Sequence, residues 1–178
     1  MSLFFITGIA GAGKSTVLSE LKRRGYEVHD ADENLSSWEH KVTRERVSAS
    51  DHKLSTDPTF FEEHDWYIDK AGVEKLANEA ADKTVFLGGS VANEDEVWEC
   101  FNEVFCLFVG DETLELRIKN RIDKDFGKSD HELAHLLKLN QQVKDKYSSL
   151  GAIMINATKP VGDIADEVVR IAEAVKSN

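Results

Sequence analysis

Apolar runs of strand length alternate with amphipathic stretches along most of the chain. The strand-length runs cover residues 2–7, 26–30, 84–89, 103–109 and 152–156. Apolar character that continues through a run, instead of alternating, is typical of parallel strands covered by helices on both faces. The pattern therefore predicts five parallel strands in the centre of an α/β fold.

Between these runs, apolar positions repeat with helical spacing. Residues 14–25 form one such stretch, which Gly25 is expected to end. Two further stripes consist of Leu114, Ile118 and Ile122, and of Ile164, Val168, Ile171 and Val175. Stripes of this kind face a core, and repeated β–α alternation implies right-handed crossovers with helices on both faces of the sheet. We therefore predict a three-layer α/β/α sandwich.

Two segments interrupt the alternation. Residues 34–68 combine tryptophan, histidine and arginine side chains with weak periodicity, and residues 123–130 are polar and contain a glycine. Such departures in a compact domain are often functional loops or lids. Because no repeat or linker is visible, residues 1–178 are predicted to form one domain, with an acceptor-binding insertion at about 34–68 and a lid at about 121–131.

The charge balance argues against nucleic acid as a partner. The chain has 33 acidic and 22 basic residues among 178, which gives a formal net charge of −11 at pH 7. Nucleic-acid binding draws much of its affinity from a basic face. Any site for a phosphorylated ligand must therefore be built locally from a few cations.

Other features indicate a cytoplasmic protein that does not bind a membrane. The N-terminal residues 1–8 lack a basic segment and have only a five-residue apolar run, so we interpret them as a strand instead of a signal peptide. No apolar segment has the length of a membrane span. Cys100 and Cys106 are expected to be free thiols in a reducing compartment. Either a monomer or a homodimer is compatible with the sequence.

The stretch GIAGAGKS, from Gly8 to Ser15, matches the phosphate-loop pattern G-x-x-x-x-G-K-[ST] in full. It lies between a predicted strand and a predicted helix, which is the context that the motif requires. Small residues let successive backbone N–H groups turn inward around an anion, and the helix points its positive end at the same place. The residues expected to bind the nucleotide here are Gly8, Ala10, Gly11, Ala12, Gly13, Lys14, Ser15 and Thr16.

Two side chains of this loop have predicted roles in phosphate chemistry. Lys14 is expected to reach the β- and γ-phosphates of ATP, and the Ser15 hydroxyl is expected to ligate Mg²⁺. A GTPase is disfavoured because the chain has no N-K-x-D segment and no D-x-x-G after a strand. An ABC-type ATPase is disfavoured by the short chain and by the lack of an apolar strand that ends in consecutive acids.

Asp30 and Asp32 follow the second predicted strand. Ligands collect at the carboxyl edge of an open parallel sheet, and alternate residues of an extended segment point to the same side. Asp30 is therefore a candidate to hold Mg²⁺, and Asp32 is a candidate to orient or deprotonate an acceptor hydroxyl. The alternative is that these acids only form a turn and cap the next helix.

A phosphate loop followed by D-x-D at the end of the second strand resembles the small P-loop kinases, such as shikimate, gluconate, dephospho-CoA and nucleoside monophosphate kinases. The resemblance extends over the whole chain, and residues 88–108 are similar to a group of bacterial kinase-like proteins. It implies the P-loop NTPase fold, a five-stranded parallel sheet in the order 2-3-1-4-5, a small lid, and ATP with Mg²⁺.

The resemblance also implies roles for residues in the second half of the chain. Arg117 and Arg121 match the lid-entrance arginines that clasp the phosphates of the donor, and their spacing places them on one helix face. The implied catalytic residues are Lys14, Asp32, Arg117 and Arg121. The loop implied to contact adenine consists of Ala157, Thr158, Lys159 and Pro160.

Two departures from the family pattern leave the acceptor open. Asn156 stands where the adenine loop usually begins with an acid. Gly88 and Gly89 stand where nucleoside monophosphate kinases carry D-G-x-P-R, so the arginine that would hold a nucleotide acceptor is absent. The leading hypothesis is an ATP-dependent enzyme that transfers the γ-phosphate to a hydroxyl or phosphate of a small metabolite. The alternatives are a nucleoside or nucleotide kinase, and a nucleotide-binding switch protein without kinase turnover.

The insertion contains candidate acceptor-binding residues. Its cations Arg44, Arg46 and Lys53 could receive an anionic acceptor, and its aromatic residues Trp38, Trp66 and Tyr67 could stack on a ring. The alternative interpretation is that the aromatic residues belong to the core and the cations are solvated.

The stretch HELAH, residues 131–135, matches the zinc-binding pattern H-E-x-x-H. A helix would place His131 and His135 on one face. A zinc site is disfavoured because no third ligand follows at a familiar spacing and because Ser129 and Glu132 form a capping box.

Overall fold

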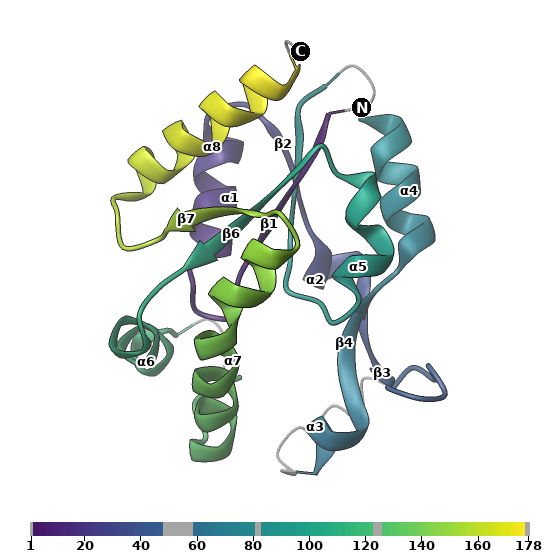
Figure 1. Ribbon diagram of the computed structural model, residues 1–178, viewed down its shortest axis with the longest axis vertical. Coiled ribbons are helices and arrows are strands. Elements are labelled where there is room, and N and C mark those ends of the chain that lie inside the picture. Colours follow the sequence, from purple (N-terminus) through teal and green to yellow (C-terminus); the bar gives the residue numbers. More distant parts are fainter. Residues whose placement is uncertain (1, 48–58, 81–82, 123–125, 177–178) are drawn as a thin grey trace.

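The computed structural model describes all residues except 1, 48–58, 81–82, 123–125 and 177–178. Its centre is a sheet of five parallel strands (Figure 1). The strands are β1 (Leu3–Thr7), β2 (Glu27–Asp30), β5 (Val85–Gly88), β6 (Glu103–Phe108) and β7 (Ile153–Asn156). They lie in the order β2-β5-β1-β6-β7. Counted along the chain, this order is 2-3-1-4-5, so the predicted fold class is confirmed.

The central strand β1 has core on both of its faces, because successive side chains of a strand point to opposite sides. Phe4 and Ile6 pack in the cluster that includes α1 (Lys14–Arg23) and α8 (Val161–Lys176). Leu3 and Phe5 pack in the cluster on the other face, together with α4 (Lys70–Glu79) and α5 (Glu94–Val97). All five residues of β1 are buried, which explains why its apolar character is continuous.

The remaining elements are α2 (Ala31–Asn34), the 3-10 helix Trp98–Cys100, α6 (Asp111–Asn120) and α7 (Asp130–Ser149). The predicted helical stripe of Leu114, Ile118 and Ile122 is wrong in its last member. Leu114 and Ile118 are fully buried, but α6 ends at Asn120 and Ile122 is 96% exposed. Within the described ranges, no helix is both long enough and apolar enough to cross a bilayer.

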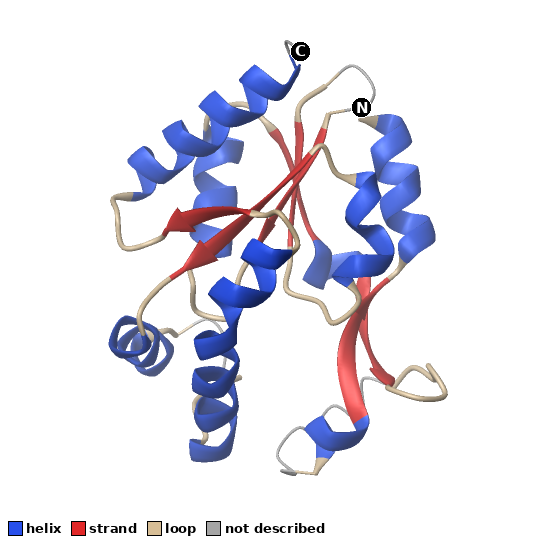
Figure 2. Cartoon of the chain, viewed as in Figure 1, coloured by secondary structure: helices blue, strands red, loops and turns tan. Residues whose placement is uncertain are grey.

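The insertion contains a two-stranded antiparallel hairpin that the sequence pattern did not predict. It consists of β3 (Ser36–His40) and β4 (His64–Ile68), with α3 (Phe60–Glu63) directly before β4. Figure 2 shows this ribbon projecting away from the main sheet, with α3 at its far end. Trp38 and Trp66 are directly paired across the two strands, and their rings meet edge to face with centroids 5.4 Å apart.

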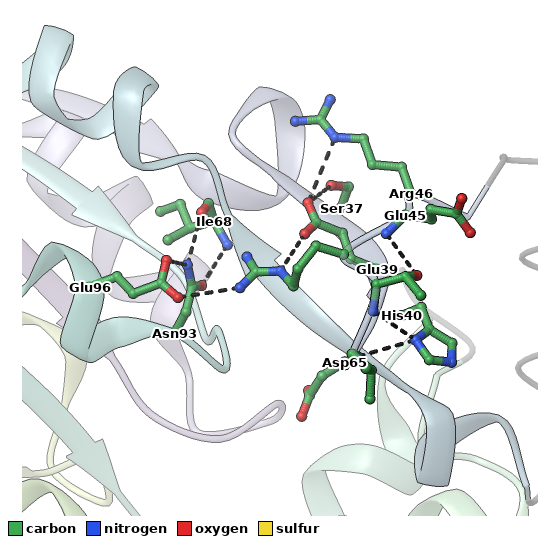
Figure 3. Close-up of polar contacts among 12 residues, drawn as sticks. Ser37, Glu39, His40, Glu45, Arg46, Asp65, Ile68, Asn93 and Glu96 are labelled. Carbon is green, nitrogen blue, oxygen red and sulfur yellow. Dashed lines mark hydrogen bonds and ion pairs between the residues drawn. The ribbon is translucent and has the colours of Figure 1, made fainter.

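One buried amide anchors the base of the hairpin to the main domain. Asn93 accepts a hydrogen bond from Ile68 N at 2.9 Å and donates to Ile68 O at 3.1 Å (Figure 3). The same Nδ2 donates to Glu96 at 2.9 Å, and Ala92 N donates to Trp66 O at 2.7 Å. Since Asn93 is only 3% exposed, these bonds hold the hairpin against the loop that follows β5.

Candidate functional site

The phosphate loop follows β1 directly and ends at the first residue of α1. Gly8, Gly11 and Gly13 all have positive φ, at 138°, 89° and 108°, a conformation that glycine adopts without strain because it has no Cβ. Lys14 Nζ donates to the backbone carbonyls of Gly8 at 2.7 Å and Ile9 at 3.2 Å. The ammonium group therefore lies against the loop, and the N-terminal end of α1 is directed at the same region.

Arg117 of α6 connects the phosphate loop with the loop between β7 and α8. Its Nη1 donates to Ala12 O at 2.8 Å, and its Nη2 donates to Ala157 O at 2.8 Å. The planar guanidinium supplies both bonds at once. Two loops separated by more than 140 residues of chain are thus joined by one of the predicted site residues.

Arg121 was predicted to share a helix face with Arg117, and this prediction is wrong. Arg121 is the C-terminal cap of α6 and has an extended backbone, with φ −71° and ψ 144°. The last residue of the helix is Asn120. Both arginines nevertheless line the same cavity.

The predicted adenine loop is ordered by the residue that departs from the family pattern. Asn156 Oδ1 accepts from Thr158 N at 3.0 Å and from Thr158 Oγ1 at 2.8 Å. An amide oxygen therefore makes the turn contacts that an acid at this position could make. Ala157 and Lys159 line the cavity, whereas Thr158 and Pro160 are not part of its wall.

All these groups surround one cavity of about 1150 Å³. The phosphate loop, Arg117 and Lys159 line it, and so do the hairpin residues Trp38 and Trp66, whose strands lie on the opposite side of the molecule from α6 in Figure 1. Its described wall contains six lysine or arginine residues and three aspartates, although the chain carries a net charge of −11. The cavity is therefore locally basic, as we predicted for a site that binds a phosphorylated ligand.

Asp30 and Asp32 both line this cavity, but their local geometry is not the extended one that was predicted. Asp30 is the N-cap of α2 and accepts from Asp32 N at 3.0 Å, so Asp32 lies in the first helical turn. Asp30 therefore caps the next helix, as the alternative interpretation expected, and it also lines the cavity. Asp32 Oδ1 accepts from Trp66 Nε1 at 3.1 Å, which ties this carboxylate to the hairpin.

The donor atoms near the phosphate loop fit a magnesium ion. Ser15 and Asp30 line the cavity and offer hard oxygen ligands, which Mg²⁺ prefers. In the part of the chain that the structure describes, no group of three or more His, Cys, Asp or Glu side chains could hold a metal ion. Mg²⁺ is usually bound by one or two protein ligands together with phosphates and waters.

The predicted anion-binding role of Arg44 and Arg46 is not supported, because neither residue lines the cavity. Arg44 donates to Glu39 at 2.9 Å and to Glu96 at 3.3 Å, and its guanidinium lies 3.7 Å from the ring centre of Tyr67. Arg46 lies 3.7 Å from the other oxygen of Glu39 (Figure 3). Tyr67 is likewise absent from the cavity wall, and Lys53 lies outside the described residues.

We expect Arg44→Ala to leave the KM for any acceptor unchanged within about twofold. The variant should instead lose about 1–2 kcal/mol of unfolding free energy, because an ion pair and a cation–π contact are removed. Urea unfolding and steady-state kinetics measure the two effects separately. Arg170→Ala, at an exposed position of α8, is the matched control, and a large rise in acceptor KM for Arg44→Ala alone would restore the anion-binding hypothesis.

Sequence reasoning missed a buried polar network behind the phosphate loop. Tyr147 of α7 hydrogen-bonds to Glu94 of α5 and lies 3.1 Å from the hydroxyl of Thr7, the last residue of β1. Lys146 donates to the other oxygen of Glu94 at 2.6 Å. Burial, together with the Glu94 carboxylate, raises the pKa of Tyr147. No sequence signal could have revealed the network, because its members come from three distant segments.

The HELAH segment has structural roles. Glu132 Oε2 accepts from Gly127 N at 3.0 Å and from Ser129 Oγ at 2.7 Å, and the predicted capping box is present. The ring of His135 stacks on Phe61 of α3 at 4.9 Å. Burial lowers the pKa of His135, which favours the neutral ring. The N-terminal half of α7 thus contacts the tip of the hairpin beside the cavity.

The parallel sheet, the glycine-bearing loop before α1 and the cavity above it define a P-loop nucleotide-binding protein. Comparison with known families agrees with this class. The AAA domain family matches residues 5–138 of the 178-residue chain, and the chain belongs to this family.

Individual relatives are consistent with the predicted kinase resemblance. A shikimate kinase of Chlorobaculum parvum is 24% identical over 184 residues, which cover 97% of this chain and 92% of that protein. Among solved structures, a shikimate kinase from Acinetobacter baumannii in complex with shikimate has a TM-score of 0.57 at 17% identity, covering 100% of this chain and 96% of that one.

Two other solved structures show the same fold. A gluconokinase from Sinorhizobium meliloti has a TM-score of 0.59 at 14% identity, with 98% of this chain and 95% of that chain covered. A deoxyadenosine kinase from M. mycoides has a TM-score of 0.60 at 16% identity, with 97% and 99% covered. Together with the family match, these findings confirm the resemblance to the P-loop small-molecule kinases.

Proposed function

We propose that the chain is an ATP-dependent phosphotransferase that transfers the γ-phosphate to a small acceptor. The observation that carries this proposal is the shared cavity, in which the phosphate loop and the pair Asp30 and Asp32 line one continuous space. Phosphoryl transfer needs alignment and charge compensation more than covalent chemistry. The relatives described as kinases of shikimate, gluconate and deoxyadenosine support the same reaction class.

The donor is assigned to the basic end of the cavity. The loop amides from Gly8 to Thr16 and the Lys14 ammonium would hold the β- and γ-phosphates. Arg117 already lies between Ala12 and Ala157, so its charge is close to where the triphosphate and the adenine loop would meet. Arg121 would compensate negative charge on the phosphoryl group during transfer. The adenine ring is assigned to residues 157–160, which include Thr158, Lys159 and Pro160.

Ser15 and Asp30 are the residues that would hold Mg²⁺. When bound, the ion neutralises charge on the phosphate oxygens. Asp32 is assigned to the acceptor, whose hydroxyl it would orient or deprotonate. The bond from Trp66 Nε1 keeps this carboxylate in place. In this proposal residues 1–178 form one domain, 34–68 form the acceptor-binding insertion, and 121–131 form a lid that excludes water.

The proposal is tested by a coupled ADP-release screen in the presence of Mg·ATP. Acceptor candidates include nucleosides, nucleotides, sugar acids, shikimate and pantothenate derivatives. ADP formation that one class stimulates strongly above the rate with ATP alone is the expected result. ATP binding without stimulation by any acceptor would instead favour the alternative of a nucleotide-dependent switch protein. A nucleoside or nucleotide acceptor is a second candidate, because Trp38 and Trp66 both line the cavity.

Asp32→Asn is expected to lower kcat with the identified acceptor by about 10²-fold, in the range observed for removal of a general base. The KM for ATP should change by less than about threefold, because the side chain is assigned to the acceptor. The amide oxygen can still accept from Trp66 Nε1, so the fold should persist. Asp145→Asn, at an exposed position of α7 outside the cavity wall, is the control. An unchanged kcat would remove Asp32 from the mechanism.

A further inference from the structure

The charged side chains of the cavity are divided between its two ends. The cations Lys14, Arg117, Arg121 and Lys159 line the end that holds the phosphate loop and the β7–α8 loop. Another cation of the cavity wall, Lys146, is paired with the buried Glu94 at 2.6 Å. Of the three aspartates of the described wall, Asp30 is assigned to Mg²⁺ near the phosphate loop, whereas Asp32 of α2 and Asp65 of β4 both accept hydrogen bonds from Trp66 of the hairpin. The acceptor end is therefore acidic.

Of the described cations of the hairpin, one lysine lines the cavity and offsets part of this acidity. Arg44 and Arg46 pair with Glu39 outside the cavity wall. Among the described hairpin residues, Lys41 is the one lysine or arginine that lines the cavity, and its Nζ donates to Phe61 O at 2.5 Å. Burial lowers the pKa of His135, which favours the neutral form of this ring.

Two carboxylates hold one tryptophan at this end. Trp66 donates through its backbone N–H to Asp65 Oδ1 at 2.9 Å and through its indole N–H to Asp32 Oδ1 at 3.1 Å. The ring of Trp66 meets Trp38, which also contacts Phe61 with centroids 5.8 Å apart. The result is an aromatic wall in which Trp66 is bonded to one carboxylate through its backbone and to another through its indole. Aromatic faces bind the apolar faces of rings and attract cations.

We propose that the acceptor is a ring-bearing alcohol without negative charge, whose hydroxyl or amine hydrogens bind to Asp32 and Asp65 while its ring lies on Trp38 and Trp66. This inference rests on the proposed function, since it names the class of molecule that receives the phosphate. Ionised carboxylates are acceptors only, so they bind hydroxyl and amine donors and repel a carboxylate or phosphate in the same space. Sugar acids and nucleotides are thereby excluded in favour of neutral sugars, aminosugars or nucleosides.

Matched ligands that differ only in charge test the inference. One series is glucuronate, glucose and glucosamine, and one pair is shikimate and its methyl ester. Binding is measured by tryptophan emission with a non-hydrolysable ATP analogue and Mg²⁺ present, because two of the three tryptophans line the cavity. Turnover of the same compounds is measured by ADP release with Mg·ATP. We expect the uncharged or cationic member to bind at least about tenfold more tightly than the anionic member, which corresponds to about 1.4 kcal/mol.

Asp65→Asn links this preference to the site. The amide oxygen can still accept from Trp66 N, so the hairpin geometry is kept while one negative charge is removed. We expect the preference against the anionic member to fall severalfold in this variant and to stay unchanged in Asp145→Asn. Equal or tighter binding of the anionic members, no binding of any probe, or a preference that Asp65→Asn does not alter would overturn the inference.

The two proposals fail in distinguishable ways. Faster turnover of glucuronate or shikimate than of the uncharged partner contradicts the acceptor class and leaves the phosphotransferase standing. Selective binding of the uncharged ligands without ADP release contradicts the phosphotransferase and supports the ligand class.

Discussion

Lys14→Ala is expected to lower acceptor-dependent ADP formation by about 10³-fold, the scale seen when a charged group that stabilises a phosphoryl or oxyanion transition state is removed. The ammonium group lies against the carbonyls of Gly8 and Ile9, beside the place where the phosphates are assigned. Its charge compensates the phosphate oxygens most strongly as the transferring group separates. The effect should therefore appear mainly in kcat and, to a smaller degree, in ATP affinity.

Two measurements support this test. Kinetics are compared with those of Lys22→Ala, an exposed position of α1 that removes an equal charge from the same helix. ATP affinity is measured by calorimetry with Mg²⁺ present. If Lys14→Ala binds and turns over ATP as well as the parent protein, the assignment of the phosphate loop as the donor site is wrong.

Gly8→Ala is expected to destabilise the fold by about 2–5 kcal/mol, because two costs add at this position. Gly8 has φ of 138°, and an added Cβ would lie 2.4 Å from Leu107 O of the neighbouring strand. A backbone carbonyl in a central strand cannot move aside without disturbing the sheet. The melting temperature should fall by roughly 5–15 °C for a chain of this size, and nucleotide affinity should fall with it.

Gly25→Ala separates the two costs. Gly25 also has positive φ, at 93°, but an added Cβ would meet no atom within 4 Å. Gly25→Ala should lose about 1–2 kcal/mol of unfolding free energy, because only the positive φ is unfavourable for alanine there. Its nucleotide affinity should be unchanged. Equal losses of stability in the two variants, measured by thermal unfolding, would show that the contact with Leu107 does not matter.

The sequence predicted best those elements whose conformation depends on residues that are close together in the chain. The phosphate loop, α1 and the five parallel strands follow from glycine positions and from apolar runs in neighbouring residues. The prediction failed where the chain had to end or bend a helix for tertiary reasons. Ile122 kept the four-residue spacing of Leu114 and Ile118, yet it lies beyond the end of α6 and is exposed.

The hairpin side of the cavity could not be predicted because its geometry depends on pairings between distant residues. Asp32 and Trp66 are 34 positions apart, and their bond exists because β3 and β4 pair in a particular register. Arg44 and Arg46 looked equivalent to site residues in the sequence, but Glu39 of β3 forms ion pairs with both of them. Nothing in residue spacing distinguishes a cation that faces a ligand from one that faces a buried carboxylate.

Sequence alone determined the class of protein and the place of its phosphate loop, since a phosphate-binding turn is built from consecutive backbone N–H groups and needs only small residues before a helix. Tertiary structure decided the charge and shape of the opposite end of the cavity. It did so because the Asn93 anchor and the Trp38–Trp66 pair place the hairpin beside Asp32. Side chains that are remote along the chain acquire a common electrostatic environment only once the fold has brought them together.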